Sequence, residues 1–240
     1  MLTTQQLQDC LNVVNDALKA KTPNNVEVIW LKIQDLCGID GLLLGVSETN
    51  LELDMAESTA IWFGIAGAWL DIYRDKNFAL IDPVVRMSME EDRIITWREA
   101  FCKYEAGAEE FIEQAVKYGL SDGYAIGKAC NSVTHTASIA SVTFNHNLVT
   151  VAQHVLIQNI LPHLNEIVAR PGFLRRPELT GQEKKALQWA NQKKSHVEIA
   201  RILGITERTV RFHFNNIYNK YSVRDKVSAI QKARIYGEFV

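Results

Sequence analysis

The last quarter of the chain contains a run of side chains suited to contact with nucleic acid. Arg208 and Arg211 can each donate two hydrogen bonds to a guanine edge, and Asn215 can pair with an adenine edge. Lys220 can meet a phosphate, which positions a protein on DNA without reading sequence. Thr209 belongs to the same run. An ordinary helical hairpin with a solvated, charged face has a similar content of Arg and Lys, so the neighbouring elements decide between the two interpretations.

Four short helices are predicted around this run, because each has a recognisable start. Thr180 and Ser195 are each followed three residues later by a glutamate, the pattern of a capping box. Thr206 can cap the next helix, and Ser222 with Asp225 is a weaker version of the same device. We therefore expect helices to begin near Thr180, Ser195, Thr206 and Ser222.

The two middle helices have the spacing of a helix-turn-helix. Ala200 is small enough for a second helix to cross close above it, and Gly204 allows the backbone to turn. The helix that follows, from about Glu207 to Tyr221, carries the polar run. The remaining buried and turn positions are Ile199, Leu203, Ile205 and Val210.

The segment from Leu179 to Ile230 resembles the LuxR-type DNA-binding domain. The matching positions are Leu179, Thr180, Glu183, Leu187, Trp189, Lys194, Ser195, Glu198, Ile199, Ala200, Leu203, Ile205, Thr209, Val210, His213, Asn216, Lys220 and Val223. Asn191 and Lys193 depart from the Ala-x-Gly that the family often has before the lysine. The resemblance implies binding to double-stranded promoter DNA, with contacts from Lys194, Ser195, Arg208, Thr209, Arg211, Asn215, Asn216 and Lys220.

Charge divides the chain in the same place. From Glu178 onward there are 12 Lys and Arg against 6 Asp and Glu, a net charge of +6, whereas the preceding part carries 14 against 22, a net of −8. A basic module joined to an acidic one predicts a nucleic-acid partner for the first only. Pro171, Gly172 and Pro177 mark a linker, which we place at residues 170–178 between domains at 1–169 and 179–240.

Composition indicates a soluble protein of the cytoplasm. No run of 18 apolar residues predicts a membrane span, and the start of the sequence lacks the basic and apolar regions of a signal peptide. The four cysteines are scattered, and none forms a CxxC or lies at metal spacing from a histidine. We therefore expect reduced thiols, and no metal site or cofactor.

The first 169 residues predict a sandwich in which helices cover both faces of an antiparallel sheet, so that the whole chain is α+β with an all-α C-terminal domain. Helices are expected at 4–20, 25–37, 61–74, 108–118 and 148–168, and strands at 41–46, 51–53, 94–96, 123–130 and 136–144. Pro162 lies inside the last helix and predicts a kink or break there.

A second group of residues in this domain combines aromatic and polar side chains. Trp69 and Tyr73 are four residues apart and share a helix face, and Asp82 and Pro83 follow them. Aromatic residues on a helix usually belong to the core, and Asp-Pro usually marks a turn. As a set, however, Trp69, Tyr73, Asp82, Pro83, Trp97 and Gly123 resemble the ligand-binding domain of acyl-homoserine lactone receptors, which that family joins to the same DNA-binding module.

This resemblance implies a role for each residue. A buried Asp82 needs a donor, which a ligand amide supplies, and the indole N–H of Trp69 can serve the lactone carbonyl. Tyr73 can donate to the acyl carbonyl, and Trp97 offers a flat face to the lactone ring. Gly123 leaves room for close approach of the backbone. Ser141 and Thr143 share one strand face, where one hydroxyl can reach the amide region.

Two departures leave the ligand class open. Ile65 stands where the family commonly has a tyrosine, and Gly127 stands near the place of a usual strand proline. The expected ligand is a small-molecule signal of the acyl-homoserine lactone type, used in quorum sensing. The alternative within the family is a regulator that senses a molecule other than a lactone.

Two other classes of protein, a response regulator and an enzyme, are not supported by the sequence. A response regulator controlled by phosphorylation needs an acidic pair after its first strand, and the strand at 41–46 follows two helices and lacks it. An enzyme needs a catalytic pattern, but the six histidines form no HExxH or triad spacing, and no phosphate-binding loop or dinucleotide fingerprint is present. The chain is therefore not expected to be an enzyme, and no catalytic residues are assigned.

We also expect a homodimer on a two-fold DNA site, because one helix-turn-helix reads only a few base pairs. The apolar helix at 148–168 is the expected surface for the second copy. RNA polymerase is considered as a further partner.

Overall fold

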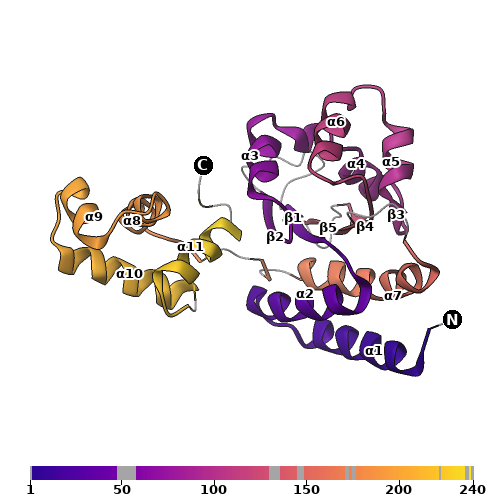
Figure 1. Cartoon of the computed structure of the whole chain (residues 1–240), viewed down its shortest axis with the longest axis horizontal. Coiled ribbons are helices and arrows are strands. Elements are labelled where there is room, and N and C mark those ends of the chain that lie inside the picture. Colours follow the sequence, from indigo (N-terminus) through magenta and orange to yellow (C-terminus); the bar gives the residue numbers. More distant parts are fainter. Residues whose placement is uncertain are drawn as a thin grey trace. The chain divides into compact units, whose positions relative to one another are not determined.

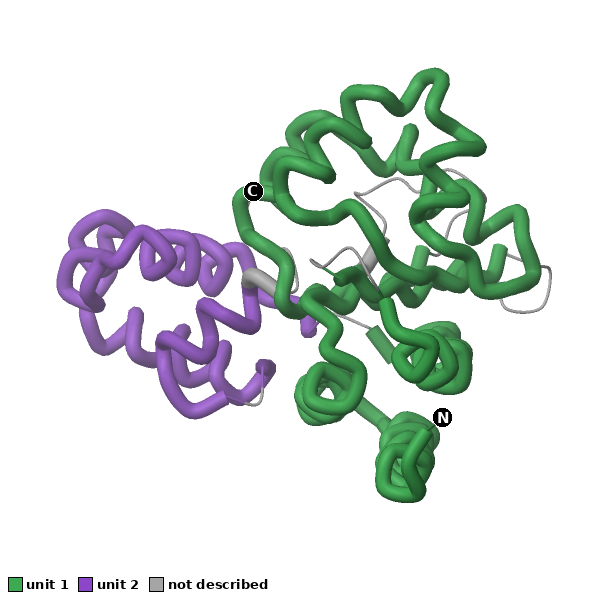
Figure 2. Tube along the Cα trace, turned by 45° about the vertical axis from the view of Figure 1, so that its right-hand side comes forward, with its two compact units in different colours: residues 1–174 green, residues 175–240 purple. Residues whose placement is uncertain are grey.

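The computed structural model describes residues 2–47, 58–129, 136–144, 149–170, 173–174, 177–221, 223–235 and 238. The chain separates into two compact units, residues 1–174 and 175–240, which are coloured separately in Figure 2. The boundary between them falls inside the predicted linker. Among the described residues, no helix is both long and apolar enough to cross a membrane.

Unit 1 is built on a five-stranded sheet. Its strands are β1 (Gly41–Ser47), β2 (Ser58–Phe63), β3 (Ile95–Thr96), β4 (Asp122–Lys128) and β5 (Ala137–Phe144). They lie in the order β2-β1-β5-β4-β3, and every neighbouring pair is antiparallel. In the register of the central strand, Ser141 pairs with Leu43 and Ala125, and Thr143 pairs with Gly41 and Gly123.

Helices cover both faces of this sheet, as Figure 1 shows. One layer consists of α1 (Thr4–Lys19), α2 (Pro23–Cys37) and α7 (Val151–Val168), and the other of α3 (Gly67–Asp75), η1 (Phe78–Leu80), α4 (Pro83–Glu90), α5 (Trp97–Lys103) and α6 (Glu109–Lys117). Side chains of β5 alternate between the layers because successive strand residues point to opposite faces. The predicted α/β/α sandwich with an antiparallel sheet is confirmed.

The segment from Ile61 to Arg74 was predicted wrongly as one helix. Ile61 lies in β2, and helix α3 begins only at Gly67. Gly64 separates the two elements with a left-handed φ of 71°, and a Cβ there would lie 2.0 Å from the carbonyl oxygen of Asp40. The apolar run of β2 pairs with β1, so tertiary pairing overrides the helical period. The predicted strand at 51–53 lies outside the described residues.

Helices α4 and α5 were not predicted, although both have starts that are visible in the sequence. Asp82 caps α4 and Pro83 occupies its first turn, where a missing N–H costs nothing. Thr96 and Glu99 form a capping box at the start of α5. Helix α7 runs through Pro162 as one element, so of the predicted kink or break the break is absent, and the kink stays a prediction.

The apolar residues of α7 are buried against the rest of unit 1. Leu156, Ile160 and Leu164 are each no more than 1% exposed, and the helix packs on α1, β1, β4 and β5. The proposal that this apolar face is available to a second copy is therefore wrong for most of its length. Only Val151 and Val155 of its apolar side chains are substantially exposed.

Unit 2 is entirely helical in its described part, as predicted. Its helices are α8 (Gly181–Asn191), α9 (His196–Leu203), α10 (Glu207–Tyr221) and α11 (Lys226–Ile235). Thr180 and Ser195 form the predicted capping boxes, and the hydroxyl of Thr206 accepts from the N–H of Thr209. The last start was predicted too early, because Asp225 caps α11 through Ser228. Ser222 itself lies outside the described residues.

The turn between α9 and α10 depends on Gly204, which has a φ of 67°. An L side chain is strained in this left-handed region, whereas glycine is not. Ala200, 7% exposed, and Val210, fully buried, lie on either side of this turn, as predicted for a helix-turn-helix.

Candidate functional site

A pocket lies between the sheet and the layer formed by α3 to α6. Its empty space amounts to about 430 Å³, including open solvent at its mouth. Its lining residues are Leu43, Trp62, Ile65, Trp69, Tyr73, Asp82, Val84, Val85, Trp97, Phe111, Leu120, Ile139, Ser141 and Thr143. Six of the eight predicted ligand-binding residues are among them. Pro83, in the first turn of α4, and Gly123, on β4, are not among the lining residues.

Among the described lining residues, Asp82 is the only one with an acidic side chain, and it is 8% exposed. Its Oδ1 accepts the backbone N–H of Val84 at 2.8 Å and of Val85 at 3.2 Å, so that it caps helix α4. Its Oδ2 accepts the hydroxyl of Tyr73 at 2.9 Å. The expectation that Asp82 lacks a partner without ligand is therefore wrong, because the helix start and Tyr73 supply three donors.

Burial nevertheless has the largest effect on the pKa of this carboxyl. It raises the pKa of Asp82 to about 6, although the hydrogen bonds from Tyr73, Val85 and Val84 each lower it. Burial, together with the neighbouring carboxylate, also raises the pKa of Tyr73 well above its ordinary value. Tyr73 thus stays protonated and keeps donating to Asp82. Its single hydroxyl proton is then not directed at the acyl carbonyl for which the sequence suggested it.

Trp69 is 2% exposed and sits in a cluster of aromatic rings. Its ring centroid lies 5.7 Å from that of Phe111, 5.8 Å from Tyr73 and 5.9 Å from Phe78. Such edge and offset contacts fix an aromatic side chain beyond what its buried area provides. Within the described part of the chain, its indole N–H makes no hydrogen bond, so this donor is available to a ligand.

Trp97 begins helix α5 and faces the sheet. Its indole Nε1 donates to the hydroxyl of Ser141 at 3.0 Å, and Ser141 in turn donates to the carbonyl oxygen of Tyr124 at 3.2 Å. A Cβ on Gly123 would lie 2.2 Å from the carbonyl oxygen of Val142 and 2.9 Å from the Trp97 Nε1. Gly123 therefore permits both strand pairing and the position of Trp97.

Thr143 lies one β-strand repeat further along the same face as Ser141. It is 2% exposed and lines the pocket. Unlike Ser141, its hydroxyl has no hydrogen-bond partner in the part of the chain that the structure describes. The sequence analysis gave both hydroxyls the same role, but in the described structure only that of Ser141 is hydrogen-bonded.

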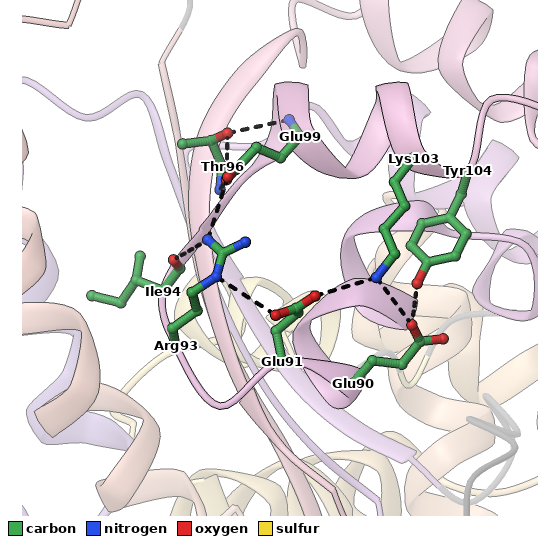
Figure 3. Close-up of polar contacts among 8 residues, drawn as sticks. All are labelled: Glu90, Glu91, Arg93, Ile94, Thr96, Glu99, Lys103 and Tyr104. Atoms are coloured by element: carbon green, nitrogen blue, oxygen red, sulfur yellow. Dashed lines mark hydrogen bonds and ion pairs between the residues drawn. The ribbon is translucent and has the colours of Figure 1, made fainter.

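A network of polar contacts joins charged side chains of α4, of α5 and of the segment between them, as shown in Figure 3. Lys103 lies 3.4 Å from Glu90 and 3.2 Å from Glu91, and Arg93 lies 3.6 Å from Glu91 and 3.3 Å from Glu99. All of these side chains are at least one-third exposed, so each pair contributes at most about 1 kcal/mol. Together they connect α4 and α5 through Glu91 and Arg93.

Several wall residues were missed by sequence reasoning. Trp62 was assigned to a helix, and Ile65 was recognised only as a departure from the family pattern. Leu43 and Ile139 lie in the predicted strands at 41–46 and 136–144, and Ile139 shares a strand face with Ser141 and Thr143, which was the available signal. Nothing local indicated Phe111 or Leu120, which reach the pocket only through the packing of α6.

The polar run in unit 2 does lie on one side of α10. Val210, Phe214, Ile217 and Tyr221 are buried. The exposed residues of the helix are Arg208, Arg211, Phe212, Asn215 and Asn219, whereas Thr209, His213, Asn216 and Lys220 lie at its half-buried edges. This arrangement gives the helix a free polar face of the kind that enters a DNA groove.

Arg211 is paired with Glu207 one turn earlier, at 2.6 Å, and both side chains are at least 40% exposed. An exposed pair of this kind is worth only about 0.3–0.5 kcal/mol, so a base edge can replace it. Phe212, 60% exposed on the same side, was not singled out from the sequence. Its place four residues after Arg208 was the available signal.

Lys194, Ser195 and Lys220 differ in how their polar groups are used. Ser195 caps α9, and the Nζ of Lys194 lies beside it, 3.7 Å from Glu198 on the surface. Lys220 donates to Glu183 at 2.7 Å and to the carbonyl oxygen of Glu178 at 2.8 Å. Because Glu183 is only 2% exposed, Lys220 compensates a buried charge inside unit 2.

Both halves of the chain match known families. Residues 28–158 match the autoinducer binding domain, and residues 177–233 match the luxR family of bacterial regulatory proteins. The quorum sensing-dependent transcriptional regulator RpaR of Rhodopseudomonas palustris is 31% identical over 173 residues, which cover 70% of each chain.

Two solved structures share the fold. SdiA in complex with octanoyl-rac-glycerol has a TM-score of 0.51 and 21% identity, covering 100% of this chain and 99% of that one. The N-acylhomoserine lactone dependent LuxR family transcription factor CepR2 from Burkholderia cenocepacia has a TM-score of 0.52 and 13% identity. That likeness covers 71% of this chain and 96% of CepR2.

Proposed function

The chain belongs to the LuxR family of quorum-sensing transcriptional regulators, with an autoinducer-binding domain and a helix-turn-helix DNA-binding domain, and we propose that its signal is an acyl-homoserine lactone. The observation that carries this proposal is the pocket. One buried carboxylate and the indole N–H of Trp69 lie in a lining that is otherwise mostly apolar and aromatic. An acyl-homoserine lactone combines a donor, two acceptors and an apolar tail in one molecule.

In this proposal, each polar group of the ligand has a partner. The ligand amide N–H donates to Asp82, whose Oδ2 receives only the Tyr73 hydroxyl in the described structure. The indole N–H of Trp69 donates to the lactone carbonyl, and Trp97 covers the ring. The acyl chain packs on the apolar lining, where Ile65 provides a wall without a hydroxyl.

A second candidate ligand is an acyl chain on a head group other than a lactone. The similarity in fold to SdiA bound to octanoyl-rac-glycerol favours this candidate. Both ligands present an acyl chain and oxygen acceptors, so the same pocket chemistry applies.

The proposal places the DNA contacts on α10 and at the start of α9. Arg208, Arg211 and Asn215 face base edges, while Lys194 and Ser195 meet the phosphate backbone. The functional form is a homodimer in the cytoplasm that binds a two-fold promoter site, and RNA polymerase is a further partner. The protein regulates transcription and is not an enzyme.

Thermal unfolding of the purified full chain tests the ligand class. A ligand that binds only the folded state stabilises it by about 2.7 kcal/mol at a hundredfold excess over Kd. We expect at least one N-acyl-homoserine lactone, from butanoyl to dodecanoyl, to raise the melting temperature. Trp69→Phe keeps an aromatic side chain, smaller than indole, but removes the N–H, so it should reduce this rise.

The outcome separates the candidates. A rise with 1-octanoyl-rac-glycerol and none with any lactone would favour the second candidate. No rise with either class would contradict both candidates. Mass spectrometry of small molecules that copurify with the protein provides an independent identification.

A further inference from the structure

Helix α1 carries two apolar stripes, and only one of them packs on unit 1. The helix lies against α2 and α7 as the outermost helix of its layer, as Figure 1 shows. The inner stripe is buried, with no member more than 8% exposed, and consists of Cys10, Val13 and Ala17. The second, which we call the outer stripe, consists of Leu7, Leu11, Val14 and Leu18. A helix that packs only on its own domain needs a single apolar face, so the outer stripe indicates a further contact.

The exposure of the outer stripe is concentrated on one helix. Leu7, Leu11 and Leu18 are 50%, 63% and 51% exposed, and Val14 is half-buried. Among the described residues, no other helix carries more than two exposed large apolar side chains. Single exposed apolar residues are ordinary on a protein surface, whereas a continuous row of them marks a contact surface.

The spacing of the outer stripe is that of a helix that pairs with another helix. Its members follow one another at intervals of four, three and four residues, which is the pattern of the core positions in a heptad. With a two-fold axis between positions 12 and 13, Leu7 lies opposite Leu18 of an antiparallel second copy, and Leu11 lies opposite its Val14. Each apolar residue meets an apolar residue, and both copies use the same surface, as an isologous dimer requires.

The border of the outer stripe also suits a second copy. On the solvent side it consists of the exposed amides Gln8, Asn12 and Asn15, and Gln8 donates to Asn12 at 3.4 Å. These amides carry no charge, so two identical copies meet there without the repulsion that like charges cause. An anionic membrane surface suits the stripe less well, because two aspartates against one lysine give α1 a net charge of −1.

A homodimer on DNA needs a surface of this kind, since most of the apolar face of α7 is buried. We propose that the outer stripe of α1 pairs antiparallel with the same stripe of a second copy and so joins two chains through unit 1. This inference rests on the proposed function for the number of copies, and it adds the surface and the direction of pairing. Two chains joined in this way present their DNA-binding units at a raised effective concentration.

Sedimentation of the full chain without DNA tests the surface, both without ligand and with the lactone that stabilises the wild type most. The wild type should form a dimer under at least one of these conditions. Leu11→Glu places an unpaired charge at the centre of the pair and should weaken the dimer at least about tenfold. Its melting temperature should stay unchanged, because Leu11 is 63% exposed. Val28→Glu is the matched control, since Val28 is 54% exposed on α2 outside the stripe, and its dimer should remain intact.

A mixture of two variants tests the direction of pairing. Val14→Lys alone should weaken the dimer as Leu11→Glu does, and the long stem of the lysine lets its ammonium group reach solvent in the separate chain. Mixed in equal amounts, the two variants should form a dimer of nearly wild-type affinity. The antiparallel register brings the introduced carboxylate opposite the introduced ammonium group and keeps the second Leu11–Val14 contact. A parallel pair leaves each introduced charge opposite an apolar side chain, so its recovery should fall well short of this.

Three results overturn the inference. The wild type sediments as a monomer under both conditions at every soluble concentration, Leu11→Glu dimerises as tightly as the wild type, or the mixture of variants fails to recover the dimer. A chain that dimerises through α1 but responds to no lactone would contradict the proposed signal and leave this inference standing. A chain that responds to a lactone but stays monomeric would contradict only this inference.

Discussion

The carboxylate of Asp82 has two roles, because it caps helix α4 and also lines the pocket. As the N-cap of α4 it holds two backbone N–H groups, and as a pocket residue it is 8% exposed. The sequence presented these as competing interpretations, but one oxygen serves the cap and the other faces Tyr73. A ligand amide therefore adds to an existing set of hydrogen bonds and does not supply the first.

Asp82→Asn should alter how stability depends on pH. Because burial raises the pKa of Asp82 to about 6, above its ordinary 3.8, the folded state holds the proton more tightly than the unfolded chain. This contribution to stability is full below pH 4 and is lost as pH rises through about 6. Asparagine keeps an acceptor for the cap and carries no charge. The free energy of unfolding of the wild type should therefore gain up to about 3 kcal/mol relative to Asp82→Asn between pH 7 and 4.

Chemical denaturation at several pH values measures this difference, with Asp75→Asn as a control that removes an exposed carboxylate from α3. At pH 7 Asp82→Asn without ligand should be at least as stable as the wild type. Its stabilisation by lactone should be lost, because the amide can turn a donor toward the ligand N–H. A normal lactone response in this variant would remove Asp82 from the ligand site.

At the scale of elements, two lysines of unit 2 have separate tasks. Lys194 lies beside the start of α9 with its ammonium group at the surface. Lys220 comes from the end of α10 and pairs with Glu183, whose carboxylate also accepts the N–H of Thr180 at the start of α8. The geometry favours Lys220 as the residue that holds α8 and α10 together, and Lys194 as the phosphate contact.

Salt dependence of DNA binding distinguishes these roles. Each phosphate contact on duplex DNA adds about 0.9 to the slope of log K against log salt concentration. Lys194→Ala should lower the slope by about that amount per protomer and leave the melting temperature unchanged. Lys220→Met should keep the slope but destabilise unit 2 by on the order of 2 kcal/mol, because it leaves Glu183 buried without its cation.

Lys220→Arg is the matched control, since it retains the charge. A lower slope for Lys220→Met with unchanged stability would instead assign Lys220 to DNA. The same titrations on a selected site and on scrambled DNA also report on Arg211. Its replacement by alanine should weaken binding to the selected site more than binding to scrambled DNA, because base contacts carry the discrimination.

At the scale of the whole molecule, the expected oligomeric state follows from the small number of base pairs that one unit can read. The single helix-turn-helix presents only a short exposed face on α10, and a module of this size reads a few base pairs. Helix α7 does not supply the dimer surface expected from its apolar sequence, since most of that face is buried on the sheet. The prediction of a homodimer therefore rests on DNA geometry.

Sedimentation of the full chain on a selected DNA site tests this prediction. We expect two protomers per site at saturation, with half-sites one helical turn apart or a multiple of that distance. Changing the half-site spacing by half a turn should abolish the tight complex, and an intact spacing with one scrambled half-site serves as the control. One protomer per site at saturating protein would contradict the prediction.

Most of what the sequence determined depends on residues three or four positions apart. The capping boxes at Thr180 and Ser195, the turn at Gly204 and the polar face of α10 are local features, so their patterns suffice to predict them. The basic charge of the last domain is likewise independent of folding. These features, with the family pattern, were enough for both the fold class and the DNA-binding module.

The tertiary structure decided which polar groups of the pocket remain free. Trp97 and Ser141 are 44 residues apart and bond to each other, and Thr143 lies between Gly41 and Gly123 only because three strands pair in one register. No local pattern encodes such contacts, since they depend on how distant segments pack. Hence the sequence named Ser141 and Thr143 together, and only the packed sheet separated a satisfied hydroxyl from an unsatisfied one.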